Sequence, residues 1–175
     1  MTKPDEKFHT DITTQMPDMG TAPLPVEPYI SAAFFERERE KIFRRAWLEV
    51  ARVEELPNPG DYVVREIEVL KTSVLLVRGK DGQVRGFHNV CTHRGMAVAI
   101  CDKGNAQGFI CNFHGWTFDI DGRLKGVPGE EYFTNLNRAD YGLRPVATDV
   151  WNGFIFVHWE PLPKVGLREF LGGLA

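Results

Sequence analysis

Three turn signals constrain the fold of this 175-residue chain more than any other feature of its sequence. The pairs Asp81–Gly82, Asp121–Gly122 and Asn152–Gly153 each lie between short runs that are rich in β-forming residues. Such pairs supply the positive φ angles of a type I′ turn, so each pair predicts a β-hairpin. Hairpins spaced this closely predict a mainly β fold, a small antiparallel β-domain that we place over residues 61–160.

The two ends of the chain have a different composition. Residues 1–28 are polar and carry five prolines, so we expect an extended or disordered arm there. Residues 29–60 form a predicted helical lead-in to the β-domain. Residues 161–175 begin with two prolines and end in a short helical fragment, and we expect them to act as a linker.

The lead-in is predicted to contain one N-terminal helix. Ser31 is a plausible N-cap for a helix over residues 32–47, because apolar residues recur on one side of the run that follows it. Glu40 and Arg44 have the i,i+4 spacing at which opposite charges pair on a solvated helix face.

Two short stretches each pair one cysteine with one histidine, and a glycine follows each histidine closely. The pairs are Cys91 with His93 and Cys111 with His114, and 17 residues separate them. Thiolate and imidazole are both metal ligands in proteins. The two stretches fall between predicted strands, so we expect two loops that bring one thiolate and one imidazole each to a shared metal centre.

Three kinds of metal centre can be compared with this spacing. A structural zinc site usually groups its cysteines together and its histidines together, whereas both pairs here are mixed. A plant-type or bacterial ferredoxin cluster needs four cysteines, and the chain has three. A Rieske [2Fe–2S] centre takes two cysteines on one iron and two histidines on the other. We favour the Rieske centre, with zinc as the alternative, and Gly95 and Gly115 would let the backbone turn sharply beside it.

The remaining cysteine and histidines are assigned other environments. Cys101 lies between the two pairs, and we interpret it as a free thiol. His9 falls in the arm, His158 at the end of a predicted strand, and His88 either in the core or next to a ligand.

Composition excludes several classes of function. Apolar residues make up 43% of the chain, enough for a normal core, and the net charge of −3 does not favour nucleic-acid binding. No apolar run has the length of a signal-peptide core or a membrane span, so we expect a cytoplasmic protein that does not enter a membrane. An odd number of cysteines in such a chain argues against structural disulfides.

The stretches FHNVCTHRGMAV at 87–98 and CNFHGWTFDIDGRL at 111–124 resemble the two cluster loops of Rieske-type ring-hydroxylating non-haem iron oxygenases, in their large (α) subunit. The segments at 35–64 and 149–163 are similar to those that precede and close the Rieske domain of these subunits. The resemblance therefore covers residues 29–175, and it implies a Rieske-type β-sandwich with two cluster-binding loops.

The resemblance also implies a site and a cofactor. It assigns one [2Fe–2S] cluster per chain, with Cys91 and Cys111 on the buried iron and with His93 and His114 on the outer iron. The residues expected around the cluster are Arg94, Gly95, Gly115, Trp116 and Phe118.

The implied activity is one-electron transfer. A reductase or ferredoxin would reduce the cluster, and the electron would pass to a mononuclear iron that oxidises an aromatic ring. By resemblance that iron belongs to a neighbouring subunit of a trimer, in a catalytic domain that we expect this chain to lack. The five histidines include no pair four residues apart in a helix, as that iron site would need. A stand-alone Rieske ferredoxin and a zinc module are the alternatives.

Two aromatic residues after the second loop bear on the reduction potential. High-potential respiratory Rieske proteins resemble this loop but carry a serine and a tyrosine where this chain has Trp116 and Phe118. Hydrogen bonds to the cluster sulfurs raise the potential, and Phe118 has no donor. We therefore predict a potential in the lower part of the Rieske range, at roughly −150 to −50 mV.

Overall fold

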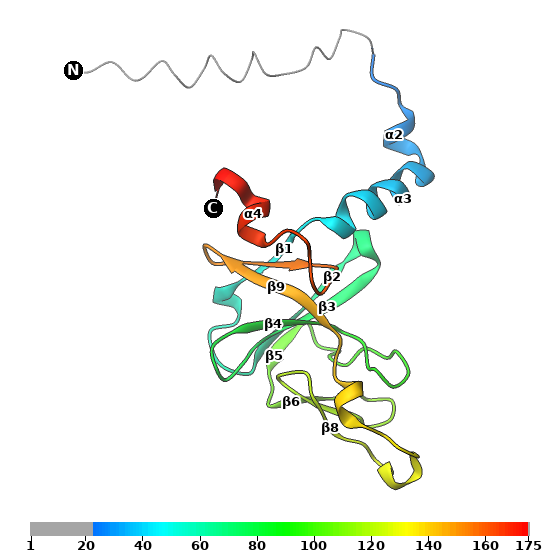
Figure 1. The fold of residues 1–175 in the computed structure, drawn as a ribbon, viewed down its shortest axis with the longest axis vertical. Coiled ribbons are helices and arrows are strands. Elements are labelled where there is room, and N and C mark those ends of the chain that lie inside the picture. The colour runs from blue at the N-terminus through cyan, green and yellow to red at the C-terminus, as the bar shows by residue number, and fades with distance from the viewer. Residues whose placement is uncertain (1–22, 175) are drawn as a thin grey trace, which may run out of the picture.

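The computed structural model describes residues 23–174. Most of the arm predicted over residues 1–28 lies outside the described residues, and its last two residues belong to helix α2 (Glu27–Ile30). Figure 1 shows α2 and α3 (Ala32–Lys41) at one end of the molecule and a small sheet at the other. Within the described part, no helix is long and apolar enough to cross a membrane.

Helix α3 begins where the sequence predicts, because the Ser31 hydroxyl oxygen accepts a hydrogen bond from the Phe34 N–H at 3.2 Å. The helix ends at Lys41, however, and not at residue 47. A 3₁₀ turn, η2 (Phe43–Arg45), follows it and leads Trp47 into a buried position, where its indole N–H donates to the Val165 carbonyl at 2.9 Å. The predicted helix is therefore too long, because burial of Trp47 redirects the chain.

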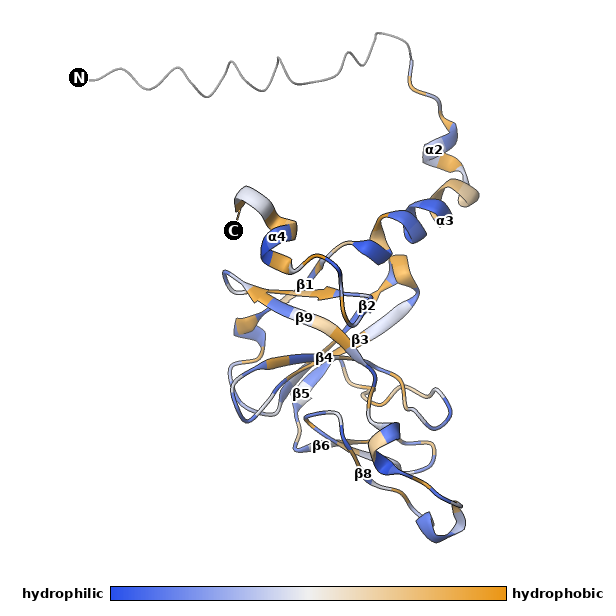
Figure 2. Cartoon of the chain, in the orientation of Figure 1, coloured by the Kyte–Doolittle hydropathy of each residue, from blue (hydrophilic) through white to orange (hydrophobic). Residues whose placement is uncertain are grey.

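The charged face of α3 is mostly solvated, and Figure 2 colours most of this helix as hydrophilic. The predicted pair of Glu40 and Arg44 forms at 3.3 Å. Arg39 is the exception, because it is buried and its guanidinium donates to the Val69 carbonyl and pairs with Glu36.

The predicted antiparallel, mainly β fold is confirmed. Seven strands form one sheet in the order β1-β10-β9-β4-β3-β2-β5, and three form a second in the order β6-β7-β8. The strands of the large sheet are β1 (Leu48–Arg52), β2 (Asp61–Ile67), β3 (Thr72–Arg78), β4 (Val84–His88), β5 (Lys103–Asn105), β9 (Pro145–Trp151) and β10 (Phe154–His158). Those of the small sheet are β6 (Gly108–Ile110), β7 (Thr117–Asp119) and β8 (Leu124–Gly126).

Short helical turns connect the strands and end the described chain. They are η3 (Val53–Glu55), η4 (Glu68–Leu70), η5 (Glu130–Tyr132), η6 (Arg138–Tyr141), α4 (Leu167–Leu171) and η7 (Gly172–Leu174). Helix α4 falls in the segment expected to be a linker, and its first residue, Leu167, is buried.

Strand β1 lies within the segment expected to be a helical lead-in. It pairs antiparallel with β10, with Leu48 opposite Val157 and Arg52 opposite Phe154. The lead-in thus contributes an edge strand of the large sheet, and its partner is about a hundred residues away in sequence. The strand is too short for its local periodicity to predict this pairing.

All three hairpins form where the turn signals predict them, but two of the turns are of a different type. Asn152 and Gly153 both have positive φ, at 48° and 84°, as a type I′ turn requires. At the other two turns, Gly82 and Gly122 have positive φ while the aspartates before them do not. These turns are three-residue loops with a bulge at the glycine, closed in the first case by the Gly79 N–H donating to the Gln83 carbonyl at 2.8 Å.

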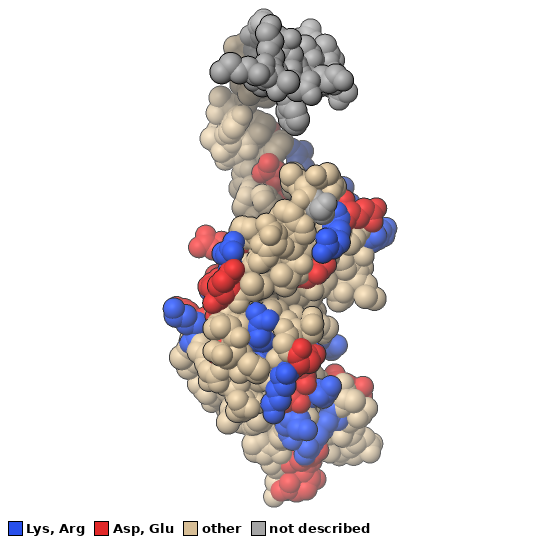
Figure 3. Space-filling view, turned by 90° about the vertical axis from the view of Figure 1, so that its left-hand side faces the viewer, with Lys and Arg blue, Asp and Glu red and all other residues tan. Residues whose placement is uncertain are grey.

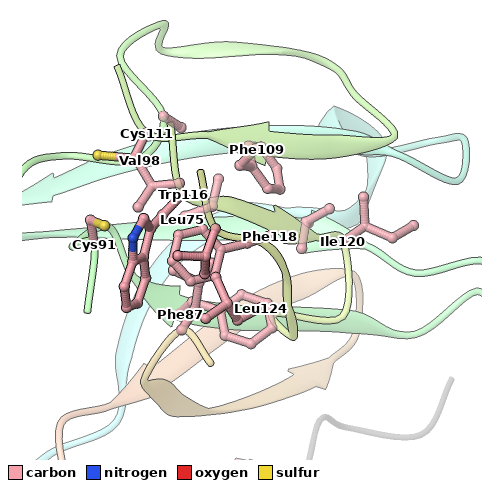
Figure 4. Close-up of a cluster of buried hydrophobic side chains, with 14 residues drawn as sticks. Leu75, Phe87, Cys91, Val98, Phe109, Cys111, Trp116, Phe118, Ile120 and Leu124 are labelled. Atoms are coloured by element: carbon pink, nitrogen blue, oxygen red, sulfur yellow. The ribbon is translucent and has the colours of Figure 1, made fainter. Parts of the chain in front are cut away.

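Strand β3 separates two cores, because successive side chains of a strand point to opposite faces. Val74 and Leu76 face a core shared with β1, β2, β9 and β10, so the large sheet curls around it. Leu75 and Val77 face the small sheet across a second core. This second core contains both Cys91 and Cys111, so the sandwich is built around the two loops (Figure 4).

Candidate metal centre

The two cysteine–histidine loops have the same backbone turn. In both, the cysteine N–H donates to the carbonyl five positions later, and the N–H of the glycine donates to the cysteine carbonyl. The distances are 2.7 Å from Cys91 N to Met96 O, 2.9 Å from Gly95 N to Cys91 O, 2.8 Å from Cys111 N to Trp116 O, and 2.9 Å from Gly115 N to Cys111 O. The glycines have φ of 79° and 72°, a conformation that an L side chain rarely adopts.

The cysteines lie at the inner end of the site. Cys91 and Cys111 are 2% and 1% exposed, and Figure 4 shows both at the same end of the core, with Trp116 nearby. Burial is the largest cause that raises the pKa of the Cys91 thiol, and the adjacent Cys111 side chain raises it further. Two buried thiols in contact would both ionise only beside a compensating cation, which a metal centre supplies.

The histidines lie together at the partly exposed side of the site. The rings of His93 and His114 have centroids 4.6 Å apart at an interplanar angle of 71°. His93 Nδ1 is buried and has no hydrogen-bond partner among residues 23–174. Burial, then the charges of His114 and Arg94, lower the pKa of His93, which favours the neutral imidazole that binds metals.

This donor set fits a two-iron cluster. In the described part of the chain, no three side chains of His, Cys, Asp or Glu gather around a single ion. A Rieske cluster needs only two protein ligands on each iron. A pair of buried thiols beside a pair of imidazoles, one of which has a buried and unpartnered nitrogen, meets that requirement.

The other residues predicted around the cluster occupy different places. Trp116 is 2% exposed, and its indole lies parallel to the His93 ring at 4.7 Å between centroids. Phe118 is fully buried in the same core, while Arg94 is exposed at the tip of the first loop. Gly115 lies close to Pro128, since a Cβ on this glycine would be 2.9 Å from the proline Cγ.

Asn89 is a residue of this site that the sequence analysis does not single out. It is 3% exposed, and its Oδ1 accepts from the N–H groups of Val98 and Ala99 at 3.1 and 2.8 Å. Its Nδ2 donates to the Ala99 carbonyl at 2.8 Å. These three hydrogen bonds connect the residue before the first loop to the residues after it, so they hold together the two ends of the loop that carries Cys91 and His93. A polar amide in the otherwise apolar run before Cys91 is the signal that could have identified it.

A third segment, residues 127–141, also covers the loops. Phe133 and Tyr141 contact the Trp116 ring, at centroid distances of 6.1 and 5.5 Å. The Thr92 hydroxyl donates to the Tyr141 carbonyl at 2.6 Å, which ties this segment to the first loop. Sequence reasoning misses these contacts because Tyr141 lies 49 positions from Thr92.

The small sheet is fastened to the large one by charged side chains. Arg85, on β4, pairs with Asp81 at 2.6 Å and with Asp121 at 3.5 Å, so it joins the tips of the first two hairpins. Hydrogen bonds from Arg85 are the main reason that the pKa of Asp81 is well below its usual value.

Acidic and basic side chains are interspersed on the face that Figure 3 shows.

Within residues 23–174, Cys101, His88 and His158 have surroundings different from those of the two pairs. Cys101 is exposed in the connection between the loops. His88 packs edge-on against Trp159 at 4.8 Å, and burial lowers its pKa. His158 is buried at the end of β10, where its Nδ1 accepts from the Glu160 N–H at 3.0 Å. His9 lies outside the described residues.

Comparison with known proteins identifies the family. Residues 46–138, more than half of the chain, match the Rieske [2Fe-2S] domain family. The chain belongs to this family. Its cofactor is accordingly a Rieske-type [2Fe–2S] cluster, which decides between the two metal alternatives. The match begins two residues before β1, so the family match includes this strand, as the sheet does.

The relatives in this Rieske family are oxygenase subunits. The chain is 36% identical to the biphenyl 2,3-dioxygenase subunit alpha of Rhodococcus jostii, over 83% of this chain and 32% of the relative. It is 42% identical to the large oxygenase component of a Pseudomonas aeruginosa naphthalene 1,2-dioxygenase system, over 79% of this chain and 31% of the relative. It is also 35% identical to a glycine betaine monooxygenase oxygenase subunit of Pseudomonas aeruginosa, over 86% and 34%.

Solved structures of oxygenases share this Rieske fold. Naphthalene 1,2-dioxygenase from Rhodococcus sp. superimposes with a TM-score of 0.80 at 36% identity, over 86% of this chain and 34% of that one. The quaternary ammonium monooxygenase CntA superimposes with a TM-score of 0.75 at 31% identity, over 81% and 39%. The chain thus spans about a third of the length of the curated relatives it matches.

Proposed function

We propose that Cys91 and Cys111 hold one iron of the Rieske cluster, that His93 and His114 hold the other, and that the chain transfers single electrons for an oxygenase. When bound, the cluster takes up and returns one electron at a time. The observation that carries this proposal is the buried Nδ1 of His93, which has no protein partner among the described residues and lies in a ring packed against His114.

The protein contributes burial on one side of the site and access on the other. The two cysteines are almost fully enclosed in the core, so water is kept from the thiolate end. The two imidazoles are partly exposed, and the second nitrogen of a ligating imidazole can hydrogen-bond to a carboxylate on a partner. This arrangement suits electron exit on the histidine side.

Two partners follow from this role. The electron donor is a reductase or a ferredoxin, and the acceptor is a mononuclear iron in a catalytic domain, carried by a neighbouring subunit of the assembled oxygenase. Aromatic ring hydroxylation is the reaction that the biphenyl and naphthalene relatives support by their names. The glycine betaine relative makes quaternary ammonium compounds the second substrate class to test.

The test of this function separates electron uptake from hydroxylation. We expect the 175-residue polypeptide to be reduced by NADH and a reductase and to form no oxygenated product. The assay supplies O₂ with biphenyl, naphthalene or glycine betaine, follows cluster bleaching by absorbance and looks for product by mass spectrometry. Product from this polypeptide alone, or a protein that cannot be reduced, would contradict the proposal.

The reduction potential gives an independent check. Hydrogen bonds to the cluster sulfurs stabilise the reduced state, and Phe118 brings an apolar ring to the core that contains both cysteines. We expect a midpoint of roughly −150 to −50 mV near pH 7, and we expect Phe118→Tyr to raise it by some tens of millivolts. Protein-film voltammetry measures both values. A wild-type midpoint above about +100 mV would show that the hydrogen-bond argument is wrong.

A further inference from the structure

The two histidines of the metal centre have unequal surroundings. The His93 ring lies parallel to the Trp116 indole, with centroids 4.7 Å apart and an interplanar angle of 7°. Phe133 packs edge-on against the same imidazole at 6.2 Å. His114 packs instead against Phe113 at 3.9 Å, and the Phe113 side chain is 58% exposed. One imidazole is therefore stacked on a buried indole, and the other is backed by an exposed phenyl ring.

The indole that backs His93 is itself held from several directions. Trp116 is 2% exposed, and Tyr141 and Phe133 pack edge-on against it at 5.5 and 6.1 Å. The segment that bears both rings is tied down by the Thr92 hydroxyl, which donates to the Tyr141 carbonyl. A close-packed ring with such support has little freedom to move aside.

The same segment is fastened at its other end. Arg138 pairs with Glu130, and its guanidinium donates to the Lys125 carbonyl at 2.7 Å. Phe133 lies between these two residues in sequence. The aromatic support of His93 is therefore anchored to β8 as well as to the first loop.

We infer that Trp116 is a positioning residue for His93: its indole fixes the plane of the imidazole, so that Nδ1 would already be oriented to bind iron when the cluster is assembled. Rotation of the His93 ring about its Cβ–Cγ bond would drive the ring edge into the parallel indole face. Among the described residues, His114 has no buried ring stacked parallel to it, because its neighbour Phe113 is exposed and tilted by 39°. This inference rests on the proposed ligand role of His93, and it adds that the two imidazoles are held to different degrees. Groups that orient a metal ligand commonly change metal affinity by 10–100-fold when they are removed.

The test compares three variants of the cluster-loaded protein. Trp116→Leu removes the stacked ring, and Trp116→Phe keeps a ring in its place. Phe87→Leu is the matched control, because Phe87 is 5% exposed in the same core and makes no ring contact with either histidine in the described part of the chain. Pulsed EPR of the reduced protein reports the couplings of the two histidine nitrogens, and absorbance in the presence of a chelator reports the rate of cluster loss.

We expect Trp116→Leu to change one of the two nitrogen couplings, to leave the other unchanged, and to speed cluster loss about tenfold. Trp116→Phe and Phe87→Leu should both keep the wild-type couplings. Complete loss of the cluster in Trp116→Leu alone also supports the inference, because Trp116→Phe then acts as the rescue.

Three results would overturn the inference. The first is a Trp116→Leu protein with both couplings unchanged. The second is loss of the cluster in Trp116→Phe, since a ring alone would then be insufficient. The third is an equal effect of Phe87→Leu, since general loosening of the core would then explain the result. Failure of the proposed function is distinguishable, because the wild-type protein would then lack two nitrogen couplings.

Discussion

Replacing any one of Cys91, His93, Cys111 and His114 with alanine is expected to abolish the Rieske cluster or to disturb it severely. Each replacement would remove one of the four proposed ligands, and no other cysteine or histidine of the described chain lies in the group. Wild-type protein should contain about two irons and two acid-labile sulfides per chain, and each variant should contain far less. Metal analysis, sulfide assay and EPR of the reduced protein measure the loss.

The chain supplies a matched control for each ligand type. Cys101→Ala removes an exposed thiol in the connection between the loops, and His88→Ala removes an imidazole that packs on Trp159. Both should retain the wild-type iron content and EPR signal. Stoichiometric zinc without sulfide in the wild-type protein, or loss of the cluster in Cys101→Ala, would contradict the ligand assignment.

Asn89→Ala is expected to lower the free energy of unfolding by about 3 kcal/mol, because it leaves three backbone groups of Val98 and Ala99 without partners. Val98 and Ala99 are 5% and 7% exposed, so water replaces the lost bonds poorly. For a chain of this length the expected fall in Tm is roughly 6–12 °C. Calorimetry of the cluster-loaded protein measures it.

Asn105→Ala is the matched control for Asn89. Its side-chain amide donates two hydrogen bonds, to the Pro59 carbonyl at 3.1 Å and to Asp61 Oδ1 at 2.7 Å, but unlike Asn89 it is exposed. Asn105→Ala should lower the free energy of unfolding by less than about 1 kcal/mol, because water can replace the hydrogen bonds to both partners. Equal shifts in Tm for the two variants would show that burial of Asn89 does not decide its contribution.

The unequal surroundings of the two histidines connect the fold to the proposed electron path. His93 stacks on the buried Trp116 and packs against the 38% exposed Phe133, whereas His114 packs against the 58% exposed Phe113. Of the two imidazoles, the one at His114 is therefore the less constrained and the more easily adjusted to a partner. Under the proposed ligand assignment, the His93 imidazole would keep the cluster geometry, and the His114 imidazole would suit a contact that forms on assembly.

Local features of the sequence predict the hairpins and the ligand pairs. The turn pairs at 81–82, 121–122 and 152–153 lie between the strands they connect, because a glycine at positive φ acts on its immediate neighbours alone. The cysteine–histidine pairs likewise lie within single loops, each closed by its own glycine. The Ser31 cap is local too, since it bonds the N–H three residues ahead.

Contacts between distant segments could be found only in the tertiary structure. Strand β1 lies in a segment that the sequence predicts to be helical. Its partner β10 is far away in sequence, and only the curled sheet brings the two strands together. The stacking of Trp116 on His93, with Phe133 and Tyr141 behind it, depends on three segments that meet in one core. Spacing within one loop specifies which groups can bind a metal, but the orientation of each group is set by side chains that pack against it from elsewhere in the fold.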